Sequence, residues 1–194
     1  MKTFTTIIEK DKEPKINKGK NTVYDGGEKG ITVINENDYE FVSEPDTVMC
    51  VIYLVDRQEL LLRKEPVPAY QHRDKETAFY LTCVSGQIEK DEKPVMAIVR
   101  ELYEETGIRL NRSYSEFEYW GEFFLTKGNS MKTHMFYFPL FKDDYVLEKP
   151  NGDGSDIEKN STNVRVGITE FDLIQPSDIP SAYMVNKFRM SENV

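Results

Sequence analysis

Hydrophobic and polar residues follow one another in a pattern that predicts a strand-rich main domain. The apolar runs 47–55 and 59–63 flank Asp56-Arg57-Gln58, which has the length and polarity of a hairpin connection. Further extended apolar runs cover residues 78–84, 118–125, 133–141 and 164–169. Residues 180–190 have the pattern of a helix, and a helical turn is expected near 170–174. These elements predict a sheet with at least one covering helix.

The N-terminal part of the chain has a different pattern. Residues 1–20 mix charges of both signs and offer little to bury. Residues 22–24 and 31–34 are short β-like pieces separated by turn residues, so we expect a small antiparallel sheet over 22–41. The predicted organisation is an N-terminal extension, 1–45, followed by a main domain, 46–194.

Residues 86–108 begin at a glycine-containing turn and continue as a helix. Pro94 suits the first helical turn, and Gly107 suits the helix end. The helical repeat gathers apolar side chains on one face: Val95, Ile98, Val99 and Leu102. It gathers carboxylates on another: Glu101, Glu104 and Glu105.

Clustered carboxylates on one helix call for an explanation, because like charges at these spacings cost roughly 0.2–0.5 kcal/mol per pair. A hard divalent cation such as Mg²⁺, or Mn²⁺ in its place, removes the repulsion and keeps coordination positions for water and phosphate. The pattern therefore predicts a metal-phosphate site, in which Arg100 orients a neighbouring carboxylate. From these residues alone, a solvated acidic face is the alternative.

Composition limits the partners of the chain. A net charge of −9 over 194 residues argues against non-specific nucleic-acid binding, which depends on Lys and Arg. Cys50 and Cys83 lie in apolar stretches and are predicted to be buried thiols. No apolar run approaches the roughly 18 residues of a membrane span, and residues 1–20 lack the apolar centre of a secretory signal. We expect a cytoplasmic protein without a membrane partner.

Residues 86–108 resemble the Nudix box, which is written as glycine, five residues, glutamate, seven residues and Arg-Glu-aliphatic-any-Glu-Glu-any-Gly-aliphatic. Every defined position is matched, from Gly86 to Ile108. The resemblance implies an α/β fold, with an α/β/α sandwich around a mixed sheet. It also implies a hydrolase that depends on a divalent metal, Mg²⁺ or Mn²⁺.

The resemblance assigns roles within the box. It implies metal ligands, of which the first acts through its backbone carbonyl: Ser85, Glu101, Glu104 and Glu105. Gly86 permits the tight turn beside them, and Glu92 pairs with Arg100. On this resemblance, we expect Glu101, Glu105 and Arg100 to be the catalytic residues of the box.

Residues 63–86 are similar to the ADP-ribose and nucleotide-sugar pyrophosphatase branch of the family. The similarity would place Arg63 near a phosphate and Tyr70 near a base or ribose. Alternatively, Tyr70 and the nearby prolines only shape a β-bend. Thr82 stands where many ADP-ribose enzymes have glutamate, and Phe123 lies where a proline is common. These departures argue against strict ADP-ribose specificity.

The polar stretch 143–163 is predicted to be a long exposed loop and a candidate lid. In this branch, a loop at that place commonly supplies a late acidic residue, and Glu158 is our candidate for a general base or metal ligand. Asp153 and Asp156 are close alternatives, and a merely solvated loop is another.

The predicted substrate is a nucleoside diphosphate joined to another group, such as ADP-ribose or GDP-mannose. The alternative activity is hydrolysis of nucleoside triphosphates or dinucleoside polyphosphates. A nucleotide-sensing module that does not cut is the non-enzymatic alternative. The segment 22–41 also resembles an extension through which nucleotide-sugar enzymes of this family dimerise, so we expect a homodimer.

Overall fold

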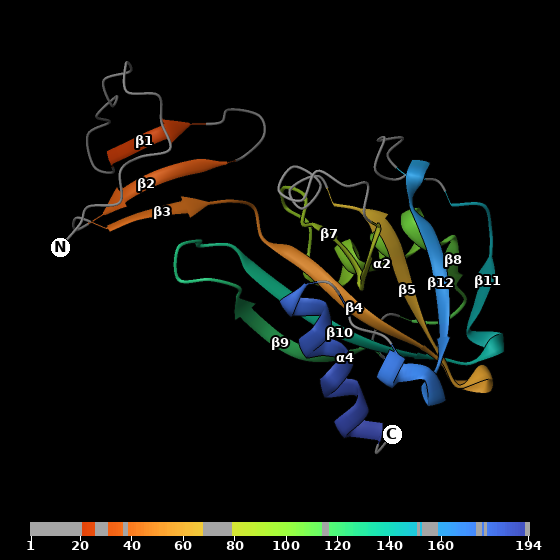
Figure 1. The fold of residues 1–194 in the computed structure, drawn as a ribbon. Helices are drawn as coiled ribbons and strands as arrows, with labels where there is room; N and C mark the ends of the chain where they lie inside the picture. The colour runs from red at the N-terminus through yellow and green to blue at the C-terminus, as the bar shows by residue number, and fades with distance from the viewer. Residues whose placement is uncertain are drawn as a thin grey trace. The chain divides into compact units, whose positions relative to one another are not determined.

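A computed structural model describes residues 21–25, 31–36, 39–67, 79–113, 117–150, 152, 159–173, 176 and 178–192. The chain divides into two compact units, the first formed by Met1–Asp46 and Phe124–Lys132 and the second by Thr47–Phe123 and Thr133–Val194. Figure 1 shows their strands and helices.

The first unit is built on a three-stranded antiparallel sheet of β1 (Asn21–Asp25), β2 (Thr32–Glu36) and β3 (Tyr39–Ser43). The small N-terminal antiparallel sheet expected from the sequence is therefore confirmed. Val42 also bonds to a distant turn, because its N–H donates to Gly128 O and its carbonyl accepts from Ser130 N, each at 2.8 Å.

The second unit contains a mixed sheet in the order β12-β5-β4-β10-β9, with β6 beside β5 and β7 beside β4. Its strands are β4 (Thr47–Leu54), β5 (Glu59–Pro66), β6 (Phe79–Thr82), β7 (Val84–Gln87), β9 (Glu118–Phe124), β10 (Lys132–Leu140) and β12 (Thr162–Gly167). Strands β4 and β10 are parallel, whereas β5 pairs antiparallel with β4, β6 and β12. The predicted hairpin between β4 and β5 is confirmed, and it turns through Val55–Arg57 and a left-handed Gln58.

Helices α2 (Pro94–Thr106) and α4 (Ile179–Glu192) cover opposite faces of this sheet. Neighbouring residues of a strand point to opposite faces. Accordingly, Val51 of β4 packs in a core cluster with Phe188 of α4, whereas Ile52 packs in a second cluster with Ile98 of α2. Figure 1 shows α4 in front of β4 and β10. The predicted α/β/α sandwich is confirmed.

The run 78–84, predicted as one strand, forms two strands that pair with different partners. β6 pairs with β5 and β7 pairs with β4, and the change falls at Cys83. The Cys83 N–H donates to Ser181 Oγ at 2.9 Å instead of joining a strand. Cys50 and Cys83 are both buried free thiols, as predicted, and burial raises the pKa of Cys83 to about 12.

The prediction of an unbroken loop over 143–163 is wrong at its start. Tyr145–Leu147 forms β11, which pairs antiparallel with β8 (Ile108–Leu110). A strand this short has too few residues for alternation to reveal it. The expected C-terminal helix is α4, and a 3-10 helix at Ile168–Leu173 occupies the place of the expected helical turn. Within the described residues, no helix is long and apolar enough to cross a membrane.

Replacing Phe188 by alanine should lower the free energy of unfolding by about 3–5 kcal/mol, because a buried aromatic ring is lost from the core. The Phe188 ring lies 5.0 Å from that of Tyr53 and 5.7 Å from that of Tyr137 between centroids. Met190→Ala is the matched control, because Met190 lies on the same helix and is 81% exposed. Urea unfolding followed by circular dichroism measures both changes. Equal effects would contradict the packing of α4.

Candidate functional site

Helix α2 places the acidic residues of the predicted site beside the sheet. Its buried side chains Ala97, Ile98 and Leu102 hold one face of the helix in the core. Glu101 and Glu105, one helical turn apart, have side chains that are only 13% and 12% exposed. Glu104 is more exposed, at 29%. The helix therefore turns two carboxylates inward and one outward.

Strand β7 supplies the surface against which Glu101 lies. A Cβ atom on Gly86 would stand 2.0 Å from the Glu101 carboxyl carbon, which is far inside van der Waals contact. Gly86 has no side chain, so the Glu101 carboxylate can approach the strand. Burial raises the pKa of Glu105, and a backbone hydrogen bond donated by Ser85, the residue before Gly86, opposes that rise. Ser85, Gly86, Glu101 and Glu105 are thus brought together.

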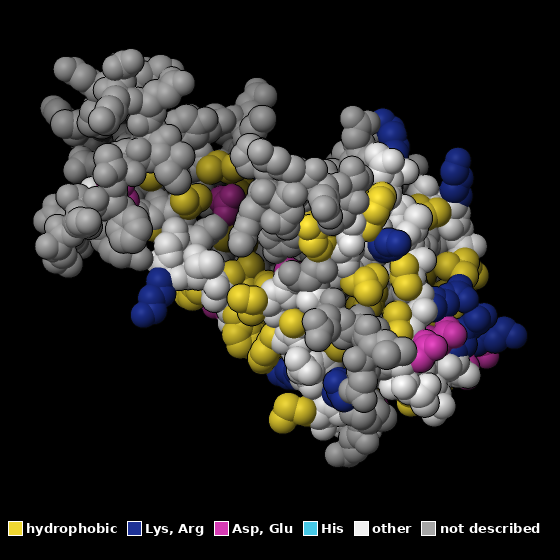
Figure 2. All heavy atoms as spheres, viewed as in Figure 1, with side chains coloured by type: hydrophobic (Ala, Val, Ile, Leu, Met, Phe, Trp, Pro, Cys, Tyr) yellow, Lys and Arg dark blue, Asp and Glu magenta, His cyan; other side chains and the backbone are white. Residues whose placement is uncertain are grey.

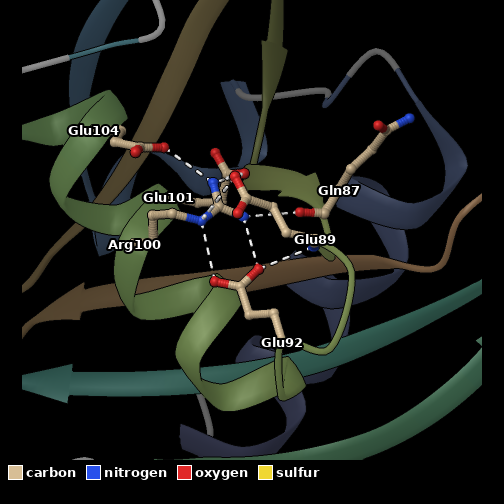
Figure 3. A network of polar contacts seen from close by, with 6 residues as sticks. All are labelled: Gln87, Glu89, Glu92, Arg100, Glu101 and Glu104. Carbon is tan, nitrogen blue, oxygen red and sulfur yellow. Dashed lines mark hydrogen bonds and ion pairs between the residues drawn. The ribbon is translucent and has the colours of Figure 1, made fainter. Parts of the chain in front are cut away.

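Arg100 organises the acidic side chains around it (Figure 3). Its Nε and Nη2 donate to the two oxygens of Glu92 at 3.1 and 3.0 Å, and Nη2 also donates to the carbonyl of Gln87 at 2.9 Å. Its Nη1 donates to Glu101 Oε1 at 2.7 Å and to Glu104 Oε2 at 3.0 Å. These bonds raise the pKa of Arg100 and lower that of Glu92. Arg100 therefore fixes Glu101 and Glu104 while Glu92 fixes Arg100.

The two inward carboxylates are costly to ionise. Burial raises the pKa of Glu101 to about 7 and that of Glu105 to about 8. Arg100 opposes this rise for Glu101, and Arg63 opposes it for Glu105, but neither guanidinium restores the ordinary value. Two buried carboxylates that lie close together favour the protonated form unless a cation neutralises their negative charge.

The oxygen atoms of this site fit a divalent cation. Glu105 Oε2 is buried without a hydrogen-bond partner, an arrangement that costs about 1–3 kcal/mol and that a bound cation would relieve. Mg²⁺ and Mn²⁺ prefer carboxylate and carbonyl oxygens, which Glu101, Glu105 and the Ser85 carbonyl supply. Among the described residues, no three His, Cys, Asp or Glu side chains already converge as a metal-binding group. Arg100 instead binds one oxygen each of Glu101 and Glu104.

A cavity of about 330 Å³ opens beside the acidic helix. One wall contains Glu104 and Glu105, and Lys149 and Lys159 also line the cavity. The remaining lining residues are Arg63, Pro150, Gly152, Ser161 and Asn163. Sequence reasoning did not select the lysines, although both lie within the polar stretch 143–163 that it singled out. Carboxylates and ammonium groups around one cavity suit a metal-bound phosphate.

The end of α2 is joined to the segment that carries Lys149. Gly107 ends the helix with φ 72°, and a Cβ there would lie 2.1 Å from the carbonyl oxygen of Glu148. Glycine is therefore required on both conformational and steric grounds. The Glu148 N–H donates to Gly107 O at 2.8 Å, directly before Lys149 in the chain.

Two of the other predicted site residues lie outside the described residues, namely Tyr70 and Glu158, as do the alternatives Asp153 and Asp156. Arg63 is described and is 4% exposed. Its Nη1 donates to the backbone carbonyl of Glu105 at 2.9 Å, so it reaches the acidic helix rather than open surface.

Gly86→Ala is expected to weaken Mn²⁺ binding by about ten- to a hundredfold, the usual cost of disturbing the groups that orient a metal ligand. The added methyl group would displace the Glu101 carboxylate. Titration of the protein with Mn²⁺, followed by the electron paramagnetic resonance of the free ion, measures the change. Gly128→Ala should bind Mn²⁺ as the wild type does, because a Cβ at Gly128 meets nothing within 4 Å. Equal binding by Gly86→Ala and the wild type would contradict the site.

Solved structures similar to this chain include an ADP compounds hydrolase and a MutT protein. A solved structure described as an ADP compounds hydrolase has a TM-score of 0.63 and 19% identity, and the match covers 93% of this chain and 96% of that chain. A MutT structure, from work on the fish pathogen Aliivibrio salmonicida and on Vibrio cholerae, has a TM-score of 0.48 and 20% identity, with coverage of 72% and 94%. No curated protein matches the chain.

The likeness to the ADP compounds hydrolase shows a shared fold. The model of the NUDIX domain matches residues 44–184, which is well over half of the chain and includes the whole acidic helix. The protein therefore belongs to the Nudix family and is a hydrolase with that family's pyrophosphatase chemistry.

Proposed function

We propose that the protein hydrolyses the diphosphate bond of a nucleoside diphosphate joined to another group, such as ADP-ribose or GDP-mannose, with Mg²⁺ or Mn²⁺ as cofactor. The observation that carries the proposal is the cavity with Glu104 and Glu105 on one wall and two lysines in its lining. Its volume, about 330 Å³, is near the lower end of the roughly 300–1,000 Å³ of small-molecule sites. Such a cavity suits a diphosphate with the attached groups extending out of it.

In the proposed site, Glu101, Glu105 and the carbonyl of Ser85 hold the cation, and Glu104 is a further ligand. The cation would neutralise the diphosphate and lower the pKa of a bound water. Arg100 keeps Glu101 and Glu104 in place through its Nη1 atom. Lys149 and Lys159 line the same cavity and are suited to bind phosphate oxygens.

Hydrolysis requires a water molecule to attack phosphorus. A new P–O bond forms as the bridging P–O bond breaks, the leaving phosphate keeps the electron pair, and a base accepts the proton of the water. We propose Glu158 as this base, with Asp153 and Asp156 as alternatives. Glu158 directly precedes Lys159, which lines the cavity. Tyr70 remains our proposed contact to the base or ribose. For ADP-ribose, the products would be AMP and ribose 5-phosphate.

With Mg²⁺ or Mn²⁺, the wild-type protein should cut nucleoside diphosphate sugars or ADP-ribose into two phosphorylated products. Glu101→Gln and Glu105→Gln should each lower turnover by at least about a hundredfold, the scale of losing a group that stabilises transition-state charge. The measurement is product identification over a panel that also contains dNTPs, NADH and dinucleoside polyphosphates. Glu118→Gln is the control, because Glu118 lies exposed on β9.

Each alternative function has its own outcome in this panel. Pyrophosphate released from dNTPs, with nucleotide sugars left intact, would favour the triphosphate hydrolase. Turnover that is unchanged in both glutamine variants would overturn the catalytic assignment. Nucleotide binding without turnover by the wild type would favour a sensing module. A cytoplasmic location and the absence of nucleic-acid binding stay predictions from composition.

We also propose that the protein is a homodimer assembled through its first unit. Ile31 and Leu125 are each 38% exposed and Phe124 is 62% exposed, which is a large apolar surface for a small unit. A hollow of about 610 Å³ in this unit is lined by Phe41, Phe124 and Leu125, among others. Figure 2 shows apolar side chains exposed near the end of β9, the strand whose last residue, Phe124, belongs to this unit.

Light scattering of the full-length protein should give about twice the chain mass of 22.6 kDa. Phe124→Asp should shift the mass toward that of one chain, because a charge in an apolar interface is costly to desolvate. Leu147→Asp is the matched control, since Leu147 is similarly exposed, at 57%, but lies in the second unit. A single 22.6 kDa species for the wild type would overturn the dimer.

A further inference from the structure

Arg63 occupies an enclosed position in the sheet. It lies on β5 with Asn163 of β12 opposite it on one side and Thr82 of β6 opposite it on the other. Its side chain is therefore flanked by both neighbouring strands, and the residue is 4% exposed. A guanidinium buried to this extent needs partners within the protein.

The partners of Arg63 are at the C-terminal end of α2. Its Nη1 donates to the carbonyl of Glu105 at 2.9 Å and to Asn163 Oδ1 at 3.1 Å. Asn163 Nδ2 in turn reaches the carbonyls of Glu105 and Thr106, each at 3.5 Å. The last carbonyls of a helix lack partners within the helix and carry its negative dipole end, so a cation there is stabilising. Arg63 and Asn163 together hold the backbone at Glu105.

The Glu105 side chain is also close to Arg63, but it is not hydrogen-bonded there. Arg63 Nε lies 3.7 Å from Glu105 Oε2, which is beyond hydrogen-bond distance, and both atoms are buried without hydrogen-bond partners. The attraction of opposite charges acts over this distance, whereas a hydrogen bond would occupy the oxygen. Glu105 Oε2 therefore stays near a positive charge and remains open to another ligand.

We propose that Arg63 is a positioning residue for Glu105, with Asn163 holding Arg63 in place, rather than a direct contact to a substrate phosphate. This proposal rests on the proposed function, in which Glu105 binds the cation. Arg63 fixes the backbone of Glu105 through Nη1 and draws its carboxylate into place by charge. Its Nη1 atom is bonded to Glu105 and Asn163, and its Nε atom lies nearest to the Glu105 carboxylate, so these atoms are directed to protein partners although the residue also lines the cavity.

The test compares Arg63→Met, Arg63→Lys and Asn163→Ala in the full-length protein. Arg63→Met should weaken Mn²⁺ binding, measured without nucleotide, by about ten- to a hundredfold and lower kcat by a similar factor, with KM for the nucleotide changed less than about twofold. Arg63→Lys should recover part of the Mn²⁺ affinity, because it keeps the charge. Asn163→Ala should have a smaller effect in the same direction, and adding it to Arg63→Met should cause little further loss.

Arg165→Met is the matched control. It removes the same charge two residues along β12, where Arg165 lies opposite Leu61 of β5, and it should leave Mn²⁺ binding unchanged. Hydrogen exchange of the Gly107 and Ile108 amides in the metal-free protein gives a second measurement. Exchange should be faster in Arg63→Met than in the wild type or in Arg165→Met. Circular dichroism during urea unfolding verifies that each variant is folded under the assay conditions.

Several outcomes would overturn the positioning role. A higher KM with unchanged Mn²⁺ affinity in Arg63→Met would mean that Arg63 contacts substrate phosphate. Unchanged kcat and Mn²⁺ affinity would mean that the bonds to α2 serve stability only. Failure of the proposed function is distinguishable, because Mn²⁺ binding is measured without nucleotide. A wild type that binds Mn²⁺ but cuts no nucleotide in the panel would overturn the substrate proposal, while the Arg63 comparison would still decide the positioning role.

Discussion

Repulsion among the carboxylates of α2 is the constraint on which the site depends. Glu101 and Glu105 are one turn apart and nearly buried, where the energy of two like charges is far higher than in water. Burial alone would leave them protonated and poor ligands. Guanidinium groups on two sides, Arg100 at Glu101 and Arg63 at Glu105, reduce this tendency. The two arginines therefore make it less costly for Glu101 and Glu105 to carry their charges within the folded protein.

The two arginines act in different ways. Arg100 donates hydrogen bonds to Glu92, Glu101 and Glu104 and so fixes these side chains. The oxygen atoms that accept these bonds are occupied by Arg100. Arg63 bonds to the backbone of Glu105 and leaves a carboxylate oxygen unbonded. One arginine thus organises the acidic face, and the other supports it from the sheet. Arg63 is buried, whereas the side chain of Arg100 is partly exposed, at 25%.

The parts of the fold with a regular period were predictable from the sequence. The hairpin at 56–58, the acidic face of α2 and the C-terminal helix follow from spacing along one segment. The switch of partner at Cys83 and the short strand β11 were not predicted, because strand pairing depends on distant residues and brief strands have no period. The contacts of Arg63 with Glu105 and Asn163 were not predicted for the same reason. Only the register of β5 with β12 places Asn163 beside it.

The bond between Gly107 and Glu148 has a mechanical consequence for the cavity. Gly107 lies two residues after Glu105, and Lys149 directly follows Glu148. One backbone hydrogen bond therefore connects the segments that carry an acidic and a basic residue of the cavity. A main-chain hydrogen bond, which does not depend on side-chain rotamers, therefore joins the end of α2 to the segment that carries Lys149. Displacement of this segment from α2 would therefore have to break a backbone hydrogen bond at Gly107.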